Sequence, residues 1–179
     1  MRLFSKQRPC IDESTFVDTT RLLIRPPIPE DSAACGETVD DFVVEQQGWL
    51  PEYREQLVAG VVRGLYASRT ERVLFDRSAG VVGMLSARPV GSWATREVGY
   101  WVGPRFRGQG YMAEGLEGFI PWLFEDGADV LIARTALDNV ASRRILAGAG
   151  FIEMYESPHT LPNGVTVASM YYERCLRRM

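Results

Sequence analysis

The sequence feature that most constrains the fold is the stretch 102–114, which reads V-G-P-R-F-R-G-Q-G-Y-M-A-E. A strand-like run at residues 97–102 leads into this stretch, and a helix-like run at residues 112–125 leaves it. Its glycines permit positive φ angles and let the backbone come close to a ligand, because they lack a Cβ atom. A helix that begins directly after them offers unpaired N–H groups and the positive end of its dipole. The pattern therefore predicts a strand, a glycine loop and a helix that together receive an anion.

Two arginines add positive charge to this loop. Arg105 and Arg107 precede Gly108 and Gly110, so fixed cations and accessible backbone N–H groups fall together. This combination is typical of a site for a phosphate or pyrophosphate. We therefore expect the loop to hold a nucleotide-like cofactor.

The same glycines allow other interpretations. Residues 108–113 also fit the loose pattern G-x-G-x-x-A of dinucleotide-binding folds, and Asp129 stands at a suitable distance for its acidic residue. However, the loop follows an apparently antiparallel meander and is not the first turn of a doubly wound unit. No G-K-[ST] follows the glycines, so a Walker-type loop is excluded. A plain glycine turn with exposed arginines is the remaining structural alternative.

Composition indicates an ordinary soluble globular protein. The chain has 179 residues, of which 46% are hydrophobic and 24% charged, enough for one domain with a hydrophobic core. No apolar run approaches the ~20 residues of a membrane helix, and no apolar segment follows the basic start, so we expect no signal peptide. The three cysteines are widely scattered and suggest neither a disulfide framework nor a zinc site, so a cytoplasmic location is the simplest expectation.

Charge and histidine content limit the function further. The net charge of -3 argues against general nucleic-acid binding and is compatible with a cationic substrate. The single histidine, His159, leaves little from which to build a histidine triad or a multi-histidine metal site. We expect no metal, no nucleic-acid partner and no membrane partner, and we interpret His159 as a loop residue rather than a base.

Hydrophobic periodicity and turn residues divide the chain into elements. Residues 1–18 show no periodicity and are interpreted as an N-terminal extension, and residues 19–179 as a single domain. In its first part we expect a strand at 20–25, a helix from 29 to about 39, a less regular segment at 40–51, and a helix at about 52–68 with Leu57, Val61 and Leu65 on one face.

The second part alternates strands and helices. We expect strands at 72–76 and 81–85 joined by a hairpin turn, a strand at about 94–102, the helix at 112–125 with an awkward Pro121, a central strand at 130–134, a helix capped by Asp138 or Asn139 and ended by Gly150, and final strands at 151–156 and 165–174 around the turn 162–164. The order β-α-α-β-β-β-α-β-α-β-β predicts an α/β fold with a mixed sheet covered by helices.

Several motifs resemble one family. The loop 105–110 resembles the R/Q-x-x-G-x-G/A signature of the GNAT acyltransferases, and specifically their RimJ/RimL-like subgroup. The run T-x-R-L-x-x-R-P at 19–26, the run E-V-G-Y-W-V before the loop, and Asn139-x-x-Ser142 followed by Gly150-Phe151 resemble the same family in the same order. The resemblance covers about residues 19–174. It implies the GNAT acyl-CoA N-acyltransferase fold, acetyl-CoA as cofactor with CoA as product, and acetyl transfer to an amine.

The resemblance also implies where the cofactor binds. Backbone N–H groups of the loop would bind its diphosphate, and the strand 100–102 would pair with its pantetheine in a gap beside the strand 130–136. A backbone N–H near Trp101 or Val102 would polarise the thioester carbonyl. Asn139 matches a cofactor-contacting asparagine and is equally suited to cap a helix. The cofactor-binding residues so implied are Tyr100, Trp101, Val102, Arg105, Arg107, Gly108, Gln109, Gly110, Tyr111, Met112 and Asn139.

Two residues would carry the catalysis by the same resemblance. Glu97 would take a proton from the attacking ammonium, or it is an exposed strand glutamate paired with an arginine. Ser142 would protonate or steady the departing thiolate, or it is a first-turn serine bonded to local backbone. A relay through Cys35 or Cys175 has no local support in the sequence, so direct attack of the amine is expected.

The acceptor stays open between a protein N-terminus and a small amine such as an aminoglycoside or a polyamine. The segments 40–53 and 156–165 would shape its pocket. A homodimer is compatible with the sequence. Two other functions remain: a regulatory CoA-binding module without catalysis and, less favoured, a dinucleotide-binding protein.

Overall fold

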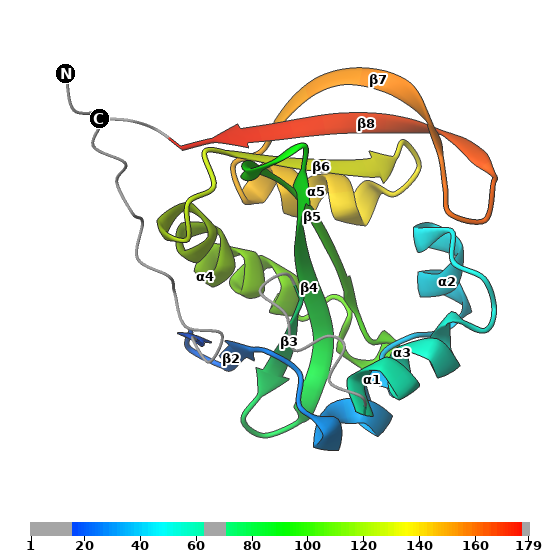
Figure 1. The fold of residues 1–179 in the computed structure, drawn as a ribbon, viewed down its shortest axis with the longest axis vertical. Helices are drawn as coiled ribbons and strands as arrows, with labels where there is room; N and C mark the ends of the chain where they lie inside the picture. The colour runs from blue at the N-terminus through cyan, green and yellow to red at the C-terminus, as the bar shows by residue number, and fades with distance from the viewer. Residues whose placement is uncertain (1–15, 63–70, 177–179) are drawn as a thin grey trace.

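A mixed sheet organises the molecule, which the computed structural model describes over residues 16–62 and 71–176. In these residues eight strands pair in the order β1-β2-β3-β4-β5-β6-β8-β7 (Figure 1). Neighbouring described strands pair antiparallel except β5 and β6, which are parallel. The expected mixed sheet is therefore confirmed, whereas the doubly wound sheet required by the dinucleotide-binding alternative is wrong.

The strands are β1 (Val17–Asp18), β2 (Leu22–Arg25), β3 (Glu71–Asp76), β4 (Gly80–Val90), β5 (Ser92–Val102), β6 (Val130–Ala136), β7 (Ile152–Thr160) and β8 (Thr166–Cys175). The α-helices are α1 (Ser32–Glu37), α2 (Asp41–Gln47), α3 (Tyr53–Val62), α4 (Tyr111–Glu125) and α5 (Val140–Gly148), and the short 3-10 helices are η1 (Pro29–Asp31) and η2 (Pro104–Phe106).

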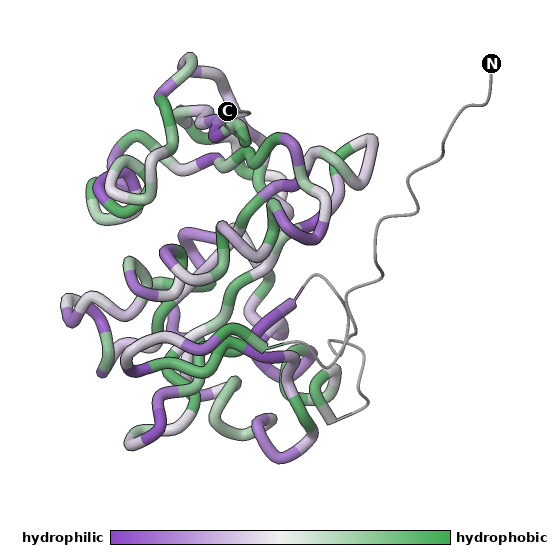
Figure 2. Tube along the Cα trace, turned by 90° about the vertical axis from the view of Figure 1, so that its left-hand side faces the viewer, coloured by the Kyte–Doolittle hydropathy of each residue, from purple (hydrophilic) through white to green (hydrophobic). Residues whose placement is uncertain are grey.

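Alternation along the strands builds a core on each face of the sheet. Leu74 and Leu85 belong to the cluster under α4 and α5, whereas their neighbours Val73 and Met84 belong to the cluster under α1 and α3. Successive strand residues point to opposite faces, so one strand serves both layers. Hydrophobic and hydrophilic segments accordingly alternate along the trace in Figure 2.

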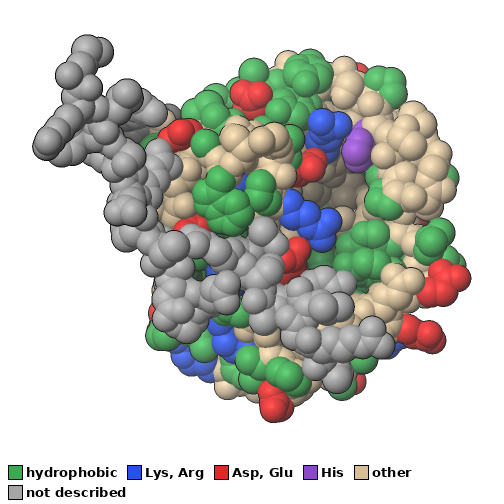
Figure 3. Space-filling view, viewed as in Figure 1, with side chains coloured by type: hydrophobic (Ala, Val, Ile, Leu, Met, Phe, Trp, Pro, Cys, Tyr) green, Lys and Arg blue, Asp and Glu red, His purple; other side chains and the backbone are tan. Residues whose placement is uncertain are grey.

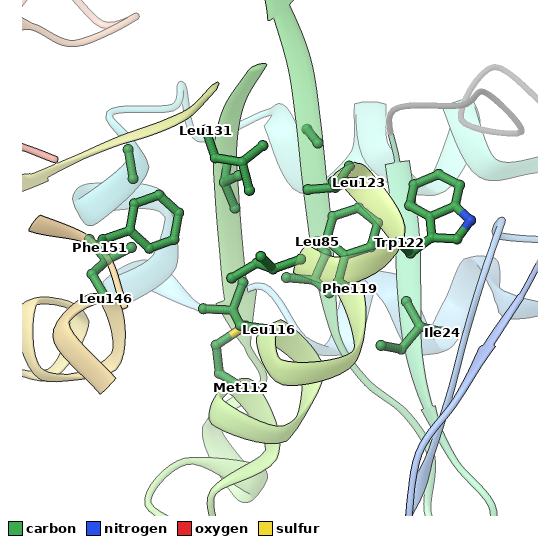
Figure 4. Packing of buried hydrophobic residues seen from close by; sticks show 14 of the residues in the cluster. Ile24, Leu85, Met112, Leu116, Phe119, Trp122, Leu123, Leu131, Leu146 and Phe151 are labelled. Carbon is green, nitrogen blue, oxygen red and sulfur yellow. The ribbon is translucent and has the colours of Figure 1, made fainter. Parts of the chain in front are cut away.

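Helix α4 supplies the centre of the larger core. Its side chains Leu116, Phe119 and Leu123 are fully buried and lie against Leu85 and Leu131 of the sheet (Figure 4). Burying each of these side chains stabilises the fold by roughly 1.5–3 kcal/mol. The strand leading to the glycine loop and the helix leaving it are thus fixed in one hydrophobic core.

Pro121 lies within α4 without ending it. The residue is exposed, and so is Glu117, whose carbonyl loses the hydrogen bond that a proline cannot donate. Because both residues lie on the exposed side of the helix, the break in hydrogen bonding does not fall in the core, and the helix continues to Glu125.

The sheet separates in its middle. Strands β5 and β6 pair only where Thr95, Arg96 and Glu97 face Val130, Leu131 and Ile132. Beyond this point β5 runs to Val102 and β6 to Ala136 without further pairing to each other. Since β4 and β8 hold the outer sides of the two strands, the strands open toward their C-terminal ends.

The structure corrects one element and extends others. The segment 40–51 was expected to be less regular, which is wrong, because α2 occupies its first half. The Asp40 carboxylate accepts from the Val43 N–H, and Gly48 closes the helix with φ +63°; both cap signals were present. The helix was overlooked because its apolar residues are consecutive instead of spaced by three or four.

Other boundaries differ by a few residues. The strand expected at 81–85 continues to Val90, and the last hairpin extends to Thr160 and Thr166 around its turn. Val17–Asp18 lies in the stretch interpreted as an N-terminal extension and pairs with β2. The expected helix at 52–68 is α3 up to residue 62, and its remainder with Leu65 lies outside the described residues. None of the helices that the structure describes is long and apolar enough to cross a membrane.

Candidate active site

Two cavities meet where β5 and β6 separate. Both are lined by α2; one of about 200 Å³ extends toward α4 and α5, and the other, of about 310 Å³, extends toward the β7–β8 hairpin. The larger one opens on the face shown in Figure 3, where basic, acidic and histidine side chains gather in a hollow. Both cavities are lined by Gln46, Gln47, Val98, Gly99, Tyr100, Trp101, Arg134 and Thr135. A molecule in one cavity can therefore reach a molecule in the other through the gap.

The glycine loop presents open backbone N–H groups. Gly108 has φ +72°, and Gly110 has φ +79° and caps α4 without a side-chain hydrogen bond. The first N–H groups of α4 thus remain available to an anion. A Cβ added at Gly108 would meet nothing within 4 Å, so glycine is required there by the backbone angle and not by space. The side chains of Tyr111 and Met112 are buried, so these residues face the loop only with their backbone.

The loop is tied to the N-terminal motif through Glu114. Its carboxylate accepts from the Thr19 hydroxyl at 2.6 Å, the Arg21 N–H at 2.7 Å and Arg21 Nε at 2.6 Å. Arg21 also donates to the Gln109 carbonyl at 3.1 Å and lies over the Tyr111 ring. Burial raises the pKa of Glu114, but the hydrogen bonds from Thr19 and Arg21 outweigh it and lower that pKa overall.

The two arginines of the loop have different surroundings. Arg107 donates to both Asp40 oxygens at 3.0 and 2.7 Å and to the Val102 carbonyl at 3.2 Å. The hydrogen bond from Arg107 lowers the pKa of Asp40. Arg105, in contrast, is 77% exposed and lies 3.8 Å from Glu37. Arg107 therefore joins α2 to β5, while Arg105 keeps a guanidinium that can turn toward a ligand.

Backbone direction distinguishes Trp101 from Val102. The Tyr100 carbonyl accepts from Gln47 and the Val102 carbonyl from Arg107, whereas the Gly103 N–H donates to Val82 of β4. Backbone groups alternate sides along a strand, so the N–H groups of Tyr100 and Val102 face the gap and that of Trp101 faces β4. Of the two residues expected to polarise a carbonyl, the geometry favours Val102.

The start of α5 brings three polar side chains together. The Asn139 side chain accepts from the Ser142 N–H at 3.0 Å and donates to Gln46 of α2 at 2.7 Å. It is therefore a helix cap that also bridges the two sides of the gap. The Ser142 hydroxyl lies 2.8 Å from the Tyr100 hydroxyl. Burial raises the pKa of Tyr100 to about 12, so this hydroxyl keeps its proton at neutral pH.

Glu97 lies on the other side of the gap, in the larger cavity. Its side chain is 43% exposed, and its carboxylate is 3.9 Å from Arg134 Nε. The cavity also receives His159 from β7, 3.4 Å from Arg134 through Nδ1. Glu97 and Ser142 are thus on opposite sides of the opening, one facing each cavity.

Three contributors to this arrangement were not predicted from the sequence: Gln46, the hydroxyl of Tyr100, and Arg134. Gln46 lies in α2, a helix that was not predicted. The role of the Tyr100 hydroxyl depends on its contact with Ser142, which is 42 residues away in the chain. Arg134 was included only in the strand expected at 130–134, and no role in the site was predicted for it. Within residues 16–62 and 71–176, no three His, Cys, Asp or Glu side chains gather to hold a metal ion.

The chain is similar to known proteins both in sequence and in fold. A family model described as "Acetyltransferase (GNAT) domain" matches residues 21–152. The FsC-acetyl coenzyme A-N(2)-transacetylase of Aspergillus fumigatus is 35% identical over 78 residues, which are 40% of this chain and 32% of that protein. The matched segment is thus about a third of the length of this curated relative.

Solved structures share the fold at low sequence identity. A GNAT-family acetyltransferase from Bacillus anthracis has a TM-score of 0.78 and 20% identity, covering 90% of this chain and 98% of that one. The ribosomal L7/L12 α-N-protein acetyltransferase RimL in complex with coenzyme A has a TM-score of 0.74 and 17% identity, covering 90% and 98%. These similarities confirm the expected fold class.

Proposed function

The chain belongs to the GNAT acetyltransferase family, and from this premise we propose that it transfers an acetyl group from acetyl-CoA directly to a primary amine. Membership confirms the resemblance seen in the sequence, and with it the expected class of an acetyl-CoA-dependent acyltransferase. One observation carries the specific proposal: the two cavities join at the gap beyond Glu97, so a thioester and an amine can meet there.

The smaller cavity and the glycine loop would hold the cofactor. Backbone N–H groups from residues 108–112 at the start of α4 fit a diphosphate, because the helix is uncapped and Gly110 has a positive φ. Arg105 and the side chain of Gln109 are exposed beside it. Asn139 would contact the pantetheine once its bond to Gln46 opens. Arg107 would contribute by holding α2 and Val102 in place.

Acetyl-CoA supplies a thioester that a neutral amine attacks readily, so the chain has three tasks. Glu97 would remove the proton from the ammonium of the acceptor, directly or through water. The Val102 N–H would donate to the carbonyl oxygen as negative charge grows on it. Ser142 would give its hydroxyl proton to the departing sulfur, and the Tyr100 hydroxyl would pass its own proton to Ser142. Water would then return a proton to Tyr100, whose raised pKa favours the protonated hydroxyl.

The acceptor would enter through the larger cavity. Its lining comes from α2, β4, β5, β6 and the β7–β8 hairpin, which agrees with the two segments proposed from the sequence. The RimL structure with coenzyme A is that of a protein that acetylates a ribosomal protein N-terminus. By this likeness we assign the chain to the RimJ/RimL-like subgroup, with a protein N-terminus or a small amine as acceptor.

Further features complete the proposal. A homodimer remains part of the proposal. A cytoplasmic location fits the free thiols of Cys35 and Cys175.

A release assay for free thiol tests the reaction. The protein and acetyl-CoA are incubated with peptides, polyamines and aminoglycosides, and CoA is measured. We expect Glu97→Gln and Ser142→Ala to lower kcat by about tenfold or more with little change in acetyl-CoA affinity. Glu125→Gln and Ser92→Ala are matched controls at exposed positions outside the two cavities.

A CoA-binding regulatory module is the second candidate function, because the Asn139–Gln46 bridge lets α2 respond to a ligand in the gap. Acetyl-CoA would then raise the melting temperature, while no acceptor in the panel would release CoA. Unchanged rates in both Glu97→Gln and Ser142→Ala would show that the assigned roles are wrong.

A further inference from the structure

Arg134 is the feature of the larger cavity that the acetyl-transfer scheme does not use. It stands on β6 at the edge of the gap, between the buried residues Ala133 and Thr135, and lines both cavities. Its side chain is 36% exposed. Its side chain interacts with His159 Nδ1 at 3.4 Å, with Glu97 Oε1 at 3.9 Å and with the Tyr171 ring, whose centroid is 5.4 Å from the guanidinium carbon.

These contacts leave most of its hydrogen-bonding capacity unused. A guanidinium has five N–H donors, and a separation of 3.9 Å is an ion pair without a hydrogen bond. Arg107 and Arg21 are instead held closely by carboxylates: Arg107 has two bonds to Asp40 of 3.0 Å or less, and Arg21 donates to Glu114 at 2.6 Å. Arg134 is therefore placed by Tyr171 and His159 but keeps donors directed to the cavity.

Both acidic and basic side chains surround Arg134 in the larger cavity. Glu97 is its acidic neighbour across the gap, and Glu45 and Asp138 line the same cavity from α2 and from the turn after β6. Arg88 is the second basic residue of the lining; it is 62% exposed and lies 3.4 Å from Glu71. A guanidinium and a carboxylate 3.9 Å apart match a ligand that carries an ammonium and an anion only a few bonds apart.

We propose that the acceptor is a primary amine with a carboxylate a few bonds away, and that Arg134 binds this carboxylate while Glu97 faces the amine. The proposal rests on the acetyl transfer proposed above and names its substrate class. Arg134 would form charge-assisted, two-point hydrogen bonds to the carboxylate. Polyamines and aminoglycosides fit this pair of groups less well, because a second ammonium at the position of the carboxylate would face the fixed cation of Arg134.

Matched acceptors test the class without any mutation. Amidated tripeptides that begin with Asp or with Asn differ only in the side-chain charge, and a Glu and Gln pair repeats the comparison. Alanine and alaninamide test whether the α-carboxylate of a free amino acid serves instead. We expect the wild-type protein to release CoA with a kcat/KM at least about tenfold higher for the carboxylate member of a pair. Equal values in every pair, or a preference for the neutral member, would overturn the proposal.

Substitutions then assign the effect to Arg134. Arg134→Met should lower kcat/KM for the preferred carboxylate acceptor by on the order of ten- to a hundredfold and change the neutral partner by less than about threefold. Arg134→Lys should lie between, since it keeps the charge and loses the planar pair of donors. Arg144→Met, at an exposed position of α5 outside both cavities, is the control. Each ratio between paired acceptors is compared between Arg134→Met and wild type, because this comparison cancels the difference in amine basicity within the pair.

The outcomes separate the two proposals. If Arg134 only balances the charge of Glu97, Arg134→Met will slow both members of a pair equally, and the substrate class is refuted while acetyl transfer stands. If no acceptor in either panel releases CoA although acetyl-CoA raises the melting temperature, acetyl transfer itself fails, and the substrate class with it. A melting temperature of Arg134→Met that matches wild type, with and without acetyl-CoA, shows that the variant is folded.

Discussion

Removing the charge of Glu114 should loosen the cofactor loop without touching the cofactor site. Glu114→Gln keeps the size of the side chain but replaces one oxygen by an amide group that cannot accept from Arg21 Nε. The carboxylate now holds Thr19 and Arg21 with three bonds of 2.6–2.7 Å, and Arg21 in turn holds the Gln109 carbonyl. The substitution therefore acts on stability and, through Arg21, on the loop.

The magnitude follows from the bonds that are lost. Each hydrogen bond to a charged group contributes roughly 1.5–3 kcal/mol, and the glutamine amide retains part of them. The carboxylate is 17% exposed, so water replaces some of the interaction, and the helix dipole adds about 0.5 kcal/mol. We expect a loss of about 2 kcal/mol in the free energy of unfolding. For a domain of this size that is a fall of about 4–8 °C in the melting temperature.

The loss should depend on pH with a defined sign. The folded state lowers the pKa of Glu114, so its contribution to stability is fully present above the unfolded value of about 4.3. It disappears as the pH falls through the folded pKa. The difference between wild type and Glu114→Gln should be constant near neutrality and shrink progressively below about pH 4.3.

Urea unfolding from pH 3 to pH 7 measures this difference, and Glu117→Gln on the exposed side of the same helix is the matched control. The KM for acetyl-CoA should rise several-fold in Glu114→Gln and stay unchanged in Glu117→Gln. A stability difference that is independent of pH would refute the role of the ionised carboxylate. An unchanged KM would show that Arg21 does not hold the loop.

Three further outcomes are expected. Tyr100→Phe should lower kcat by about tenfold with acetyl-CoA affinity unchanged, because Ser142 loses its 2.8 Å partner; equal rates in the release assay would remove Tyr100 from the proton path. Asp40→Asn should raise the KM for acetyl-CoA, because Arg107 loses its paired carboxylate, and titration by isothermal calorimetry would contradict this if affinity were retained. Gly110→Ala should cost roughly 1–2 kcal/mol of stability, because its φ of +79° is strained for alanine, with thermal unfolding as the measurement.

The glycine loop shows how far local sequence reaches. The sequence correctly predicted positive φ angles at Gly108 and Gly110. It also correctly predicted the strand before these glycines and the uncapped helix after them. Each depends on residues within a few positions of one another, since φ limits and helix ends are local properties. The turns expected at 77–80 and 162–164 followed from similar local chemistry, although β7 continues to Thr160 instead of ending at residue 156.

Partners far apart in the chain could not be predicted in the same way. Arg105 and Arg107 look equivalent in the sequence, yet Arg107 is paired with Asp40, 67 residues away. The Tyr100 hydroxyl meets Ser142 because the fold brings β5 beside the start of α5. The Asn139 amide meets Gln46 because the fold brings α2 to the same place. No pattern along the chain encodes such distances.

The sequence by itself determined the glycine loop, the order of most elements, the family and the class of reaction, because these follow from local backbone preferences and from motifs in a fixed order. Only the tertiary structure decided which groups are free. It paired Arg107 with Asp40 and directed the backbone N–H of Val102, instead of that of Trp101, toward the gap. It also left Arg134 with unused N–H donors beside Glu97. The physical reason is that hydrogen-bonding capacity is consumed by contacts between distant segments, so what remains for a ligand is known only after the chain has folded.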